Sequence, residues 1–449
     1  MLCVFIYVRK SEVDRCKGCN NMNKGELNSK ELNQIICENT AMFLCGNGFS
    51  INFDKDFSNI YDRLFEAHKS LMRNGKYEAN GGSLGKIFKD NYNNVCKYVN
   101  AFKQKNLDEF FESGVIFAED IIKNKDLMNE LQNSKYIHKL TFGTSELDIV
   151  RSIAEVGRSR GYKAVNIEYW SLLIYMYFTI RRLRDLYVFP SNNLFVTLIK
   201  IGSINQGRLV PGEEDIYQYI MSNGLNTYYR MLFATAIWNN GKAVDFEELQ
   251  DIEKLNVPKI RDFLNQFKVL ITLNYDHIIE NIVGYPIQHI HGEFIEGKKE
   301  FVYFQSLGWK SDKERYVSYS DILIGDYYIN KTFAAQVSYM NKNPRNKKIV
   351  NITRTVGKYI QEKQTNVIVI FGMNINNDQH IIRDVMLGLE EIAEKNPKII
   401  YCYYNELDKI DFEKQYVSAI TFSEEVNQKV RKIEVEYIKT EEVLDKYFR

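Results

Sequence analysis

Three short, mainly apolar runs constrain the fold of this chain more than any other feature. They are Ala41–Cys45, Phe267–Ile271 and Val367–Phe371, and each gives way abruptly to glycine or polar residues. Runs bounded in this way are typical of strands that are buried on both faces of a parallel sheet. In open α/β folds, ligands bind at the carboxyl ends of such strands. The residues that follow the three runs are therefore the first candidates for a functional site.

The remaining pattern predicts an α/β fold with a doubly wound parallel sheet and a large all-helical insertion. Helical periods alternate with strand-like runs in the second half, with helices at 259–266, 277–283 and 378–394 and strands at 268–273, 286–291 and 398–404. Between about 80 and 255, apolar residues recur every three or four positions. We expect four parts, namely a lead-in (1–40), a discontinuous α/β domain (41–80 and 255–425), the helical insertion (81–254) and a C-terminal tail (426–449).

Composition narrows the class of protein. The chain has 449 residues, of which 45% are hydrophobic, and its 59 basic and 58 acidic residues give a net charge of +1. Such a balance lacks the electrostatic signature of an autonomous DNA binder, so we expect no direct nucleic-acid binding. Met1–Val8 does not match a signal peptide, and the longest apolar stretch, Trp170–Ile180, is too short to span a bilayer. We therefore expect a cytoplasmic protein that does not bind a membrane.

Glycine turns follow the first and the last of the three strands. The first strand leads into Gly46, Asn47, Gly48, Phe49 and Ser50, and the last leads into Gly372, Met373 and Asn374, with Asp378 and His380 close behind. A glycine after a strand lets the backbone approach a ligand, and the amides of the following helix attract phosphate. We expect these residues, except Met373 and His380, to bind a nucleotide. An isolated Gly-x-Gly is more often a plain tight turn, so the expectation depends on all three strand ends together.

The middle strand is followed by side chains suited to catalysis. Asn274 and Asp276 come first, and His291 follows within His289-Ile290-His291-Gly292. An imidazole with an ordinary pKa of about 6.5 can take or give a proton at physiological pH, so His291 is a candidate general base. Asn274 offers both a donor and an acceptor, and Asp276 can accept from a carboxamide or a hydroxyl. The structural alternatives are a hydrogen-bonded histidine and helix caps at Asn274 and Asp276.

Taken in order, these segments resemble the sirtuin-like NAD-consuming domain, and most closely its bacterial anti-phage defence branch. The resemblance covers roughly residues 41–73 and 265–405. It implies NAD+ as the substrate, His291 as the catalytic base, Asn274 as the residue that binds the ribose and orients water, and Asp276 in the nicotinamide pocket. It also implies that the glycine motif holds the pyrophosphate, with Asn47 in place of the family's alanine. At Gly372–Asn374 the sequence departs from the family's Gly-Thr-Ser or Gly-His-Ser.

Another departure separates the possible activities. Sirtuin deacylases have a zinc module with two Cys-x-x-Cys pairs, and no such module lies between Cys45 and His291. Water is then the expected acceptor, which makes the protein an NAD+ glycohydrolase that depletes NAD+ in abortive infection. Two alternatives stay open. One is a non-catalytic subunit that senses NAD or ADP-ribose or acts as a scaffold, and the other is an ADP-ribosyltransferase.

Such an enzyme must stay silent until triggered. We therefore expect the helical insertion or the C-terminal tail to mediate homo-oligomerisation or docking to an activating partner, such as a hexameric DNA-translocating ATPase. Aromatic residues of the insertion, Tyr169, Trp170, Tyr175, Tyr177 and Phe178, form either core or such an interface.

We expect no metal. His289 and His291, two apart on a predicted strand, could still bind one together with Asp276. A second possibility is a zinc site formed by Cys16, Cys19, Cys37 and Cys45.

Overall fold

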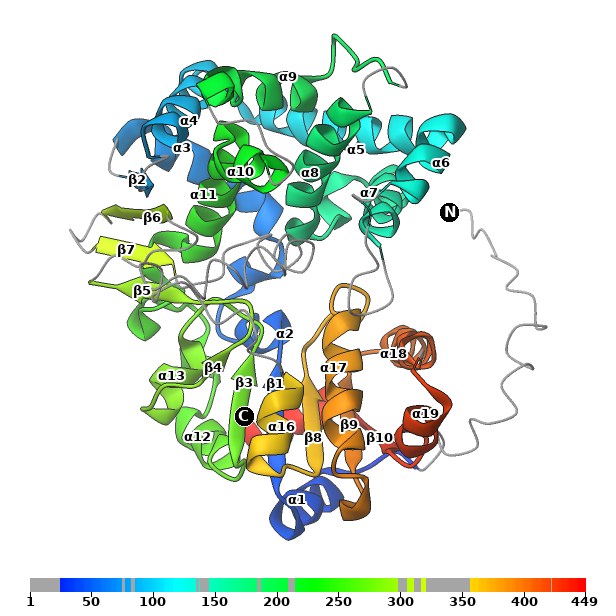
Figure 1. The fold of residues 1–449 in the computed structure, drawn as a ribbon. Coiled ribbons are helices and arrows are strands. Elements are labelled where there is room, and N and C mark those ends of the chain that lie inside the picture. Colours follow the sequence, from blue (N-terminus) through cyan, green and yellow to red (C-terminus); the bar gives the residue numbers. More distant parts are fainter. Residues whose placement is uncertain are drawn as a thin grey trace, which may run out of the picture.

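The computed structural model describes residues 25–74, 77–81, 85–134, 137, 145–183, 187–208, 215–297, 305–310, 316–319, 356–420 and 422–449. The molecule has two main regions. The sheet unit is built on a six-stranded parallel sheet, and the helical unit consists mainly of α-helices. Figure 1 shows the helical unit above the sheet unit, with α2 (Asn47–Ser50), which directly follows β1, on the side that faces the helices.

The parallel sheet has the strand order of a doubly wound nucleotide-binding fold. Its strands are β1 (Ala41–Cys45), β3 (Val269–Thr272), β4 (Gln288–His289), β8 (Val367–Phe371), β9 (Lys398–Tyr403) and β10 (Glu434–Lys439). They lie in the order β4-β3-β1-β8-β9-β10, and every pairing is parallel. In chain order this is 3-2-1-4-5-6, so the order reverses between β1 and β8. The predicted parallel α/β sheet is confirmed.

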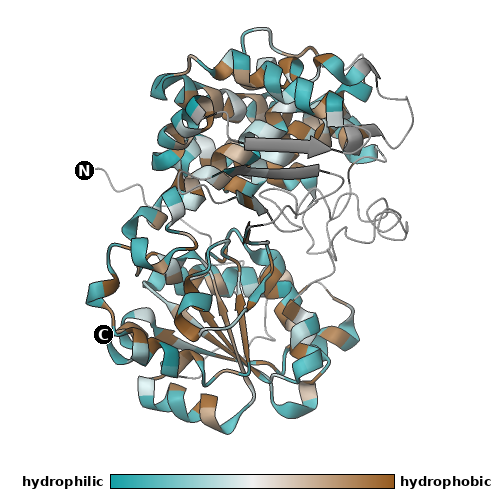
Figure 2. Ribbon diagram, turned by 90° about the vertical axis from the view of Figure 1, so that its left-hand side faces the viewer, coloured by the Kyte–Doolittle hydropathy of each residue, from teal (hydrophilic) through white to brown (hydrophobic). Residues whose placement is uncertain are grey.

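Both faces of the sheet are buried under helices. Along β1, Phe43 packs into one core and Leu44 into the other, because successive side chains of a strand point to opposite faces. One face packs against α1 (Ser29–Glu38), α12 (Val257–Leu264), α13 (Ile278–Val283) and α20 (Thr440–Tyr447). The other packs against α16 (Val356–Lys363), α17 (Gln379–Glu390), α18 (Glu406–Ala419) and α19 (Glu424–Val430). Figure 2 shows the apolar strands between helices whose outer sides are hydrophilic.

Segments from both ends of the chain belong to the sheet unit. β10 pairs with β9 along its whole length, and the Leu27 amide donates to the carbonyl of Tyr437. The Tyr447 hydroxyl on α20 donates to the carbonyl of Ser29 at the start of α1, over 3.0 Å. Residues 25–40 of the predicted lead-in and the predicted tail (426–449) therefore belong to the sheet unit.

The helical unit has its own aromatic-rich core. Its helices are α3 (Leu64–Asn74), α4 (Gly85–Val99), α5 (Gln104–Lys123), α6 (Lys125–Asn133), α7 (Glu146–Arg160), α8 (Trp170–Arg182), α9 (Leu194–Ile201), α10 (Asp215–Met221) and α11 (Gly224–Trp238). Local signals set several boundaries: Ser145 and Asp148 form a capping box at α7, which ends at Gly161 with φ of +83°. Trp170 to Ile180 are all buried on α8, so the aromatic run is core.

The boundaries of the helical unit differ from the predicted insertion. Tyr61 and Leu64 pack into the helical core, although they precede residue 81. Leu249 packs into the sheet unit, and the segment 245–254 at the end of the predicted insertion contains only the 3₁₀ turns Phe246–Glu248 and Ile252–Lys254.

A four-stranded antiparallel sheet lies beside the helices. Its strands are β2 (Tyr77–Gly81), β6 (Gln305–Lys310), β7 (Tyr316–Tyr319) and β5 (Phe294–Glu296), in the order β2-β6-β7-β5. β6 and β7 are neighbours in this sheet and pair antiparallel. β2 was not predicted, because it is short and pairs with residues far along the chain. Within the described ranges, no helix is both long and apolar enough to cross a membrane.

Candidate functional site

The loops after β1 and β8 touch each other through their backbones. The Gly46 amide donates to the carbonyl of Phe371 over 3.1 Å, and the Gly48 amide donates to that of Gly372 over 2.8 Å. A Cβ on Gly48 would lie 2.6 Å from the Gly372 Cα, and Gly372 itself has φ of +60°. These glycines are therefore required for the approach of two loops at the point where the strand order reverses. Two amides expected to hold pyrophosphate already have partners within the chain.

Two other residues of the first glycine motif have structural roles. Phe49 is fully buried in the core of the sheet unit, where its ring packs against those of Phe43, Phe53, Phe371 and Phe448. The Asn47 side chain donates to the Phe57 carbonyl over 2.7 Å. Both were predicted to bind nucleotide, but an aromatic ring immersed in the core has no surface left for a ligand.

A chain of hydrogen bonds joins Asn274, Ser50 and Asp276 at the end of β3. Asn274 Nδ2 donates to the carbonyl of Gly46 over 3.1 Å and to Ser50 Oγ over 2.9 Å. Ser50 Oγ in turn donates to Asp276 Oδ2 over 2.7 Å. Because the Gly46 carbonyl can only accept, the amide nitrogen of Asn274 must face it, and Oδ1 is left for an acceptor role. The structure thus brings together three of the predicted site residues.

Asp276 also caps the helix that follows it. Its Oδ1 accepts from the Ile278 amide at the start of α13, over 3.2 Å. Burial raises the pKa of this carboxyl, and the hydrogen bond from Ser50 opposes that rise. Both carboxylate oxygens are thus engaged within the chain, so Asp276 positions Ser50 and α13.

The second predicted catalytic group, His291, meets the loop after β8. Its Nε2 lies 3.4 Å from Nε2 of His380 on α17, and the two rings stack with centroids 5.6 Å apart. A carboxyl oxygen of Asp378 lies within 4.8 Å of one ring nitrogen of each histidine. Asp378 is the residue before α17, yet its side chain makes no capping hydrogen bond. The carboxylate therefore faces the two imidazoles rather than the helix end.

Burial sets the protonation of this group, which we call the His291 cluster (His291, Asp378 and His380). It lowers the pKa of His291 to about 4 and raises the pKa of Asp378 to about 8, with a further rise from the charge of Glu168. At pH 7 the His291 ring is therefore neutral, and Asp378 is mostly protonated.

His289 does not share a site with His291. β4 ends at His289, so the strand alternation that would place both side chains on one face does not continue to His291. His289 Nδ1 lies 2.7 Å from the Asn274 carbonyl, and its Nε2 lies 2.5 Å from Glu280 Oε1. Burial lowers the pKa of His289, but the hydrogen bond and charge of Glu280 outweigh it, and the pKa is raised. The two histidines and Asp276 therefore do not form a shared metal site.

The helical unit reaches the same edge of the sheet. Tyr275, between the two site residues Asn274 and Asp276, donates its hydroxyl to Glu168 Oε1 over 2.5 Å. Glu168 is buried in the 3₁₀ turn Ile167–Tyr169 that precedes α8. Its charge acts on both Tyr275 and Asp378. A carboxylate more than 100 residues before β3 thus belongs to the site, and no local sequence signal marked it.

The remaining predicted residues lie at the rim. Asn374 is exposed, and its Oδ1 accepts from the Asn376 amide over 3.2 Å, which makes it a turn residue. His380, noted in the sequence but given no role, is buried and faces His291. The signal that could have found it is its place two residues after Asp378, at the start of a helix. Of the proposed zinc cysteines, Cys16 and Cys19 lie outside the described residues.

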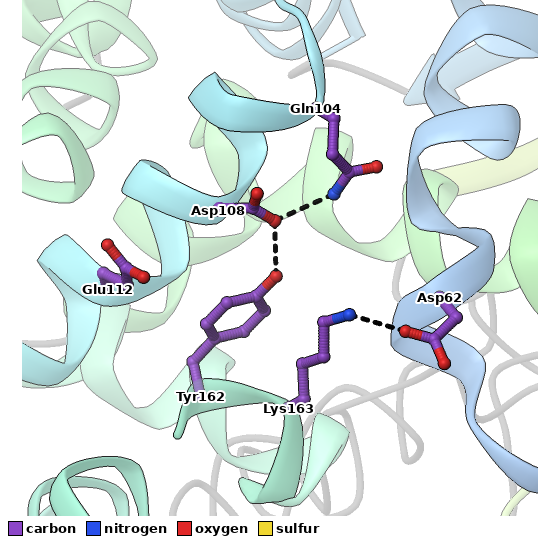
Figure 3. A pocket seen from close by; sticks show the side chains of 6 residues that line it. All are labelled: Asp62, Gln104, Asp108, Glu112, Tyr162 and Lys163. Atoms are coloured by element: carbon purple, nitrogen blue, oxygen red, sulfur yellow. Dashed lines mark hydrogen bonds and ion pairs between the residues drawn. The ribbon is translucent and has the colours of Figure 1, made fainter.

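A separate pocket lies on the helical unit (Figure 3). Its volume is about 340 Å³, and it is lined by Asp62, Gln104, Asp108, Glu112, Tyr162 and Lys163. The Tyr162 hydroxyl donates to Asp108 over 2.6 Å, and the Lys163 ammonium lies 2.6 Å from Asp62. None of these residues belongs to the strand-end site, so the pocket is not part of the candidate active site.

Comparison with known proteins adds no family to this description. No protein-family model matches the chain, and neither a curated protein nor a solved structure matches it. The case for a function therefore depends on the geometry at the carboxyl ends of β1, β3, β4 and β8.

Proposed function

We propose that the protein is an NAD+ glycohydrolase, which cleaves NAD+ into nicotinamide and ADP-ribose. The observation that supports it best is the convergence of Asn274, Ser50 and His291 on the strand ends beside the β1–β8 reversal. In sheets of this order, dinucleotides bind across that reversal. The resemblance to sirtuin-like NAD-consuming domains, described from the same residues, points to the same substrate.

The reaction needs a hydrogen-bond acceptor that orients the attacking water molecule and a base that takes its proton. Asn274 Oδ1, fixed by the two hydrogen bonds of Nδ2, accepts from the attacking water or from a ribose hydroxyl. The neutral ring of His291 takes the proton as the water oxygen bonds to C1′ and the bond from C1′ to nicotinamide breaks. Nicotinamide leaves as a neutral molecule, since its ring nitrogen keeps the bonding electrons.

The buried surroundings suit this chemistry. Asn274, Asp276 and His291 are each less than 10% exposed, so a bound nicotinamide ribose meets little bulk water. Glu168, from the helical unit, contributes a carboxylate whose charge reaches the site and opposes the positive charge that develops on the ribose. Electrostatic stabilisation of that charge is the part of the reaction that the helical unit can influence.

Direct assay tests the proposal. The full-length protein is incubated with NAD+, and nicotinamide and free ADP-ribose are quantified by chromatography. Loss of turnover in Asn274→Ala and in His291→Ala, with Asn192→Ala unaffected, is the expected result, because Asn192 is exposed in the helical unit. ADP-ribose found attached to protein instead of free would favour the transferase alternative. NAD+ binding without turnover, with or without added partner proteins, would favour the sensor.

A further inference from the structure

A second cluster of ionisable side chains lies next to the candidate active site and has no part in the proposed reaction. It consists of His277, Glu280, His289 and Glu293, called here the His289 cluster. His277 directly precedes α13, and Glu280 lies in the first turn of that helix. His289 ends β4, and Glu293 lies four residues further on. Four potential ligands thus come from two short, neighbouring segments of the sheet edge.

Their separations fit a single small cation. His277 Nε2 lies 3.2 Å from Glu293 Oε2, which lies 3.8 Å from His289 Nε2, and ligand atoms of these three residues are all within 4.8 Å of one another. In a tetrahedral zinc site with bonds of about 2.0–2.2 Å, neighbouring donor atoms lie roughly 3.3–3.6 Å apart. Glu280 Oε1 approaches His289 Nε2 to 2.5 Å, a separation at which the two share a proton that a cation would replace.

One oxygen of the cluster is left without a hydrogen bond. Glu280 Oε2 is buried and accepts from no donor, and the buried His277 Nε2 makes no hydrogen bond, although Glu293 Oε2 lies 3.2 Å from it. Buried polar atoms of folded proteins are nearly always paired, and each exception calls for an explanation. A cation between the side chains would coordinate Glu280 Oε2 and remove the cost of leaving it unpaired, and it would bind His277 Nε2 as well.

The orientation of His289 also matches that of a metal ligand. Its Nδ1 lies 2.7 Å from the Asn274 carbonyl, which can only accept, so Nδ1 carries a proton and Nε2 is directed at the cluster. Metal-binding histidines characteristically donate their other ring nitrogen to a carbonyl or a carboxylate in this way.

We propose that the His289 cluster binds a divalent transition-metal ion of the zinc class. With both imidazoles neutral, Glu280 and Glu293 leave a charge of −2 at a half-buried site, which a dication neutralises. Imidazole ligands favour zinc, cobalt or nickel over magnesium and calcium, which prefer oxygen ligands alone. The ion would join α13, the end of β4 and the loop that contains His291, and so serve a structural role.

Metal binding is tested on the full-length protein after treatment with a chelator. Zn²⁺ is added, unbound ion is removed by dialysis, and the metal content is measured by mass spectrometry. We expect about one equivalent per chain and a higher melting temperature with Zn²⁺ but not with Mg²⁺. Loading with Co²⁺ should give the visible absorption bands of a tetrahedral site. Wild-type protein that retains no metal and shows no Co²⁺ bands would overturn the proposal.

Variants then locate the ion. His277→Gln and Glu293→Gln should each weaken binding at least tenfold, whereas Glu296→Gln, exposed on the same segment as Glu293, should bind like wild type. His380→Gln distinguishes the neighbouring His291 cluster, whose ligand atoms also lie within 4.8 Å of one another. Binding lost in His380→Gln but kept in His277→Gln would contradict the proposed site. Circular dichroism of each variant identifies any that fail to fold. No readout requires NAD+ turnover, so failure of the proposed function leaves this test intact.

Discussion

His289 and His291 stand two residues apart, yet the fold gives them opposite environments. His289 has Glu280 at 2.5 Å and Glu293 at 3.8 Å, and these carboxylates raise its pKa despite its burial. His291 faces the ring of His380 instead, and burial lowers its pKa to about 4. The neighbouring carboxylates therefore favour a positive charge at His289, whereas burial keeps the His291 ring neutral and able to accept a proton.

The difference comes from the end of β4. Because the strand stops at His289, the chain turns at Ile290, and His291 is delivered towards the loop after β8 instead of towards α13. From the sequence alone the two histidines are equivalent, because they are the same residue type and are placed two apart on a predicted strand. Their environments differ because different elements pack against them and bring different carboxyl groups to each. Four substitutions test that difference.

The largest expected effect is on turnover. His291→Gln removes the proposed base but keeps a polar side chain, and nicotinamide release should fall by about 10²- to 10⁴-fold. The melting temperature should change little, because the lost ring is neutral at pH 7. Nicotinamide release close to that of wild type would contradict the assignment of His291 as the base.

The next effect is on stability. His289→Gln leaves Glu280 without its partner in a largely buried site, and this should lower the free energy of unfolding by about 3 kcal/mol. Urea denaturation at pH 7 measures it, with His291→Gln as the matched variant from the other cluster. Equal losses in both variants would mean that the two environments do not differ as described.

A pH-dependent effect should come from Asp378. Its folded pKa of about 8 lies above the ordinary value of 3.8, so between those values the folded state binds a proton that the unfolded state has lost. Its contribution to stability is therefore greatest below about pH 4 and is lost as the pH rises to about 8, by at most ~1.4 kcal/mol per pH unit. The Asp378→Asn variant has no carboxyl at this position and does not lose stability in this way. The difference in melting temperature between the variant and wild type should therefore shift in favour of the variant as the pH rises to about 8. A constant difference across pH 5–9 would refute this.

The smallest effect should come from the helical unit. Glu168→Gln keeps an acceptor for the Tyr275 hydroxyl but removes the charge that raises the pKa of Asp378. The pH at which the stability contribution of Asp378 levels off should then fall below about 8. Melting curves over the same pH series, compared with those of Asp378→Asn, measure the change. An unaltered midpoint would show that the helical unit does not influence the His291 cluster electrostatically.

The location of many candidate site residues could be predicted from the sequence, but the role of each residue was harder to predict. Asn274, Ser50 and His291 were found because polar residues after buried strands must meet at one sheet edge. Gly46, Gly48 and Gly372 lie in the loops after β1 and β8, as predicted. They were expected to contact a nucleotide, but in the structure their backbones pack against each other. Phe49 was assigned to a ligand because nothing local distinguishes a loop aromatic from one that turns into the core.

Other parts could not be found from the sequence at all. Glu168 reaches the site from a different unit, and its partner Tyr275 lies 107 residues further along the chain. His277 and Glu280 lie at the start of a helix, where polar residues are common, so they carry no signal of a site. His289 and Glu293 contact them only because β4 lies next to α13 in the fold. Side chains that depend on long-range contacts leave no periodic trace in the sequence.

The sequence by itself determined the parallel sheet, the helical region and the strand ends where chemistry could occur. Buried strands and amphipathic helices are specified by the local period of apolar residues, and that period is read directly along the chain. Tertiary structure alone decided the strand order, the addition of β10 and α1 to the sheet unit, and the partners of each histidine. Those depend on which distant segments share a face, and the opposite pKa shifts of His289 and His291 follow from those segments rather than from the residues next to them.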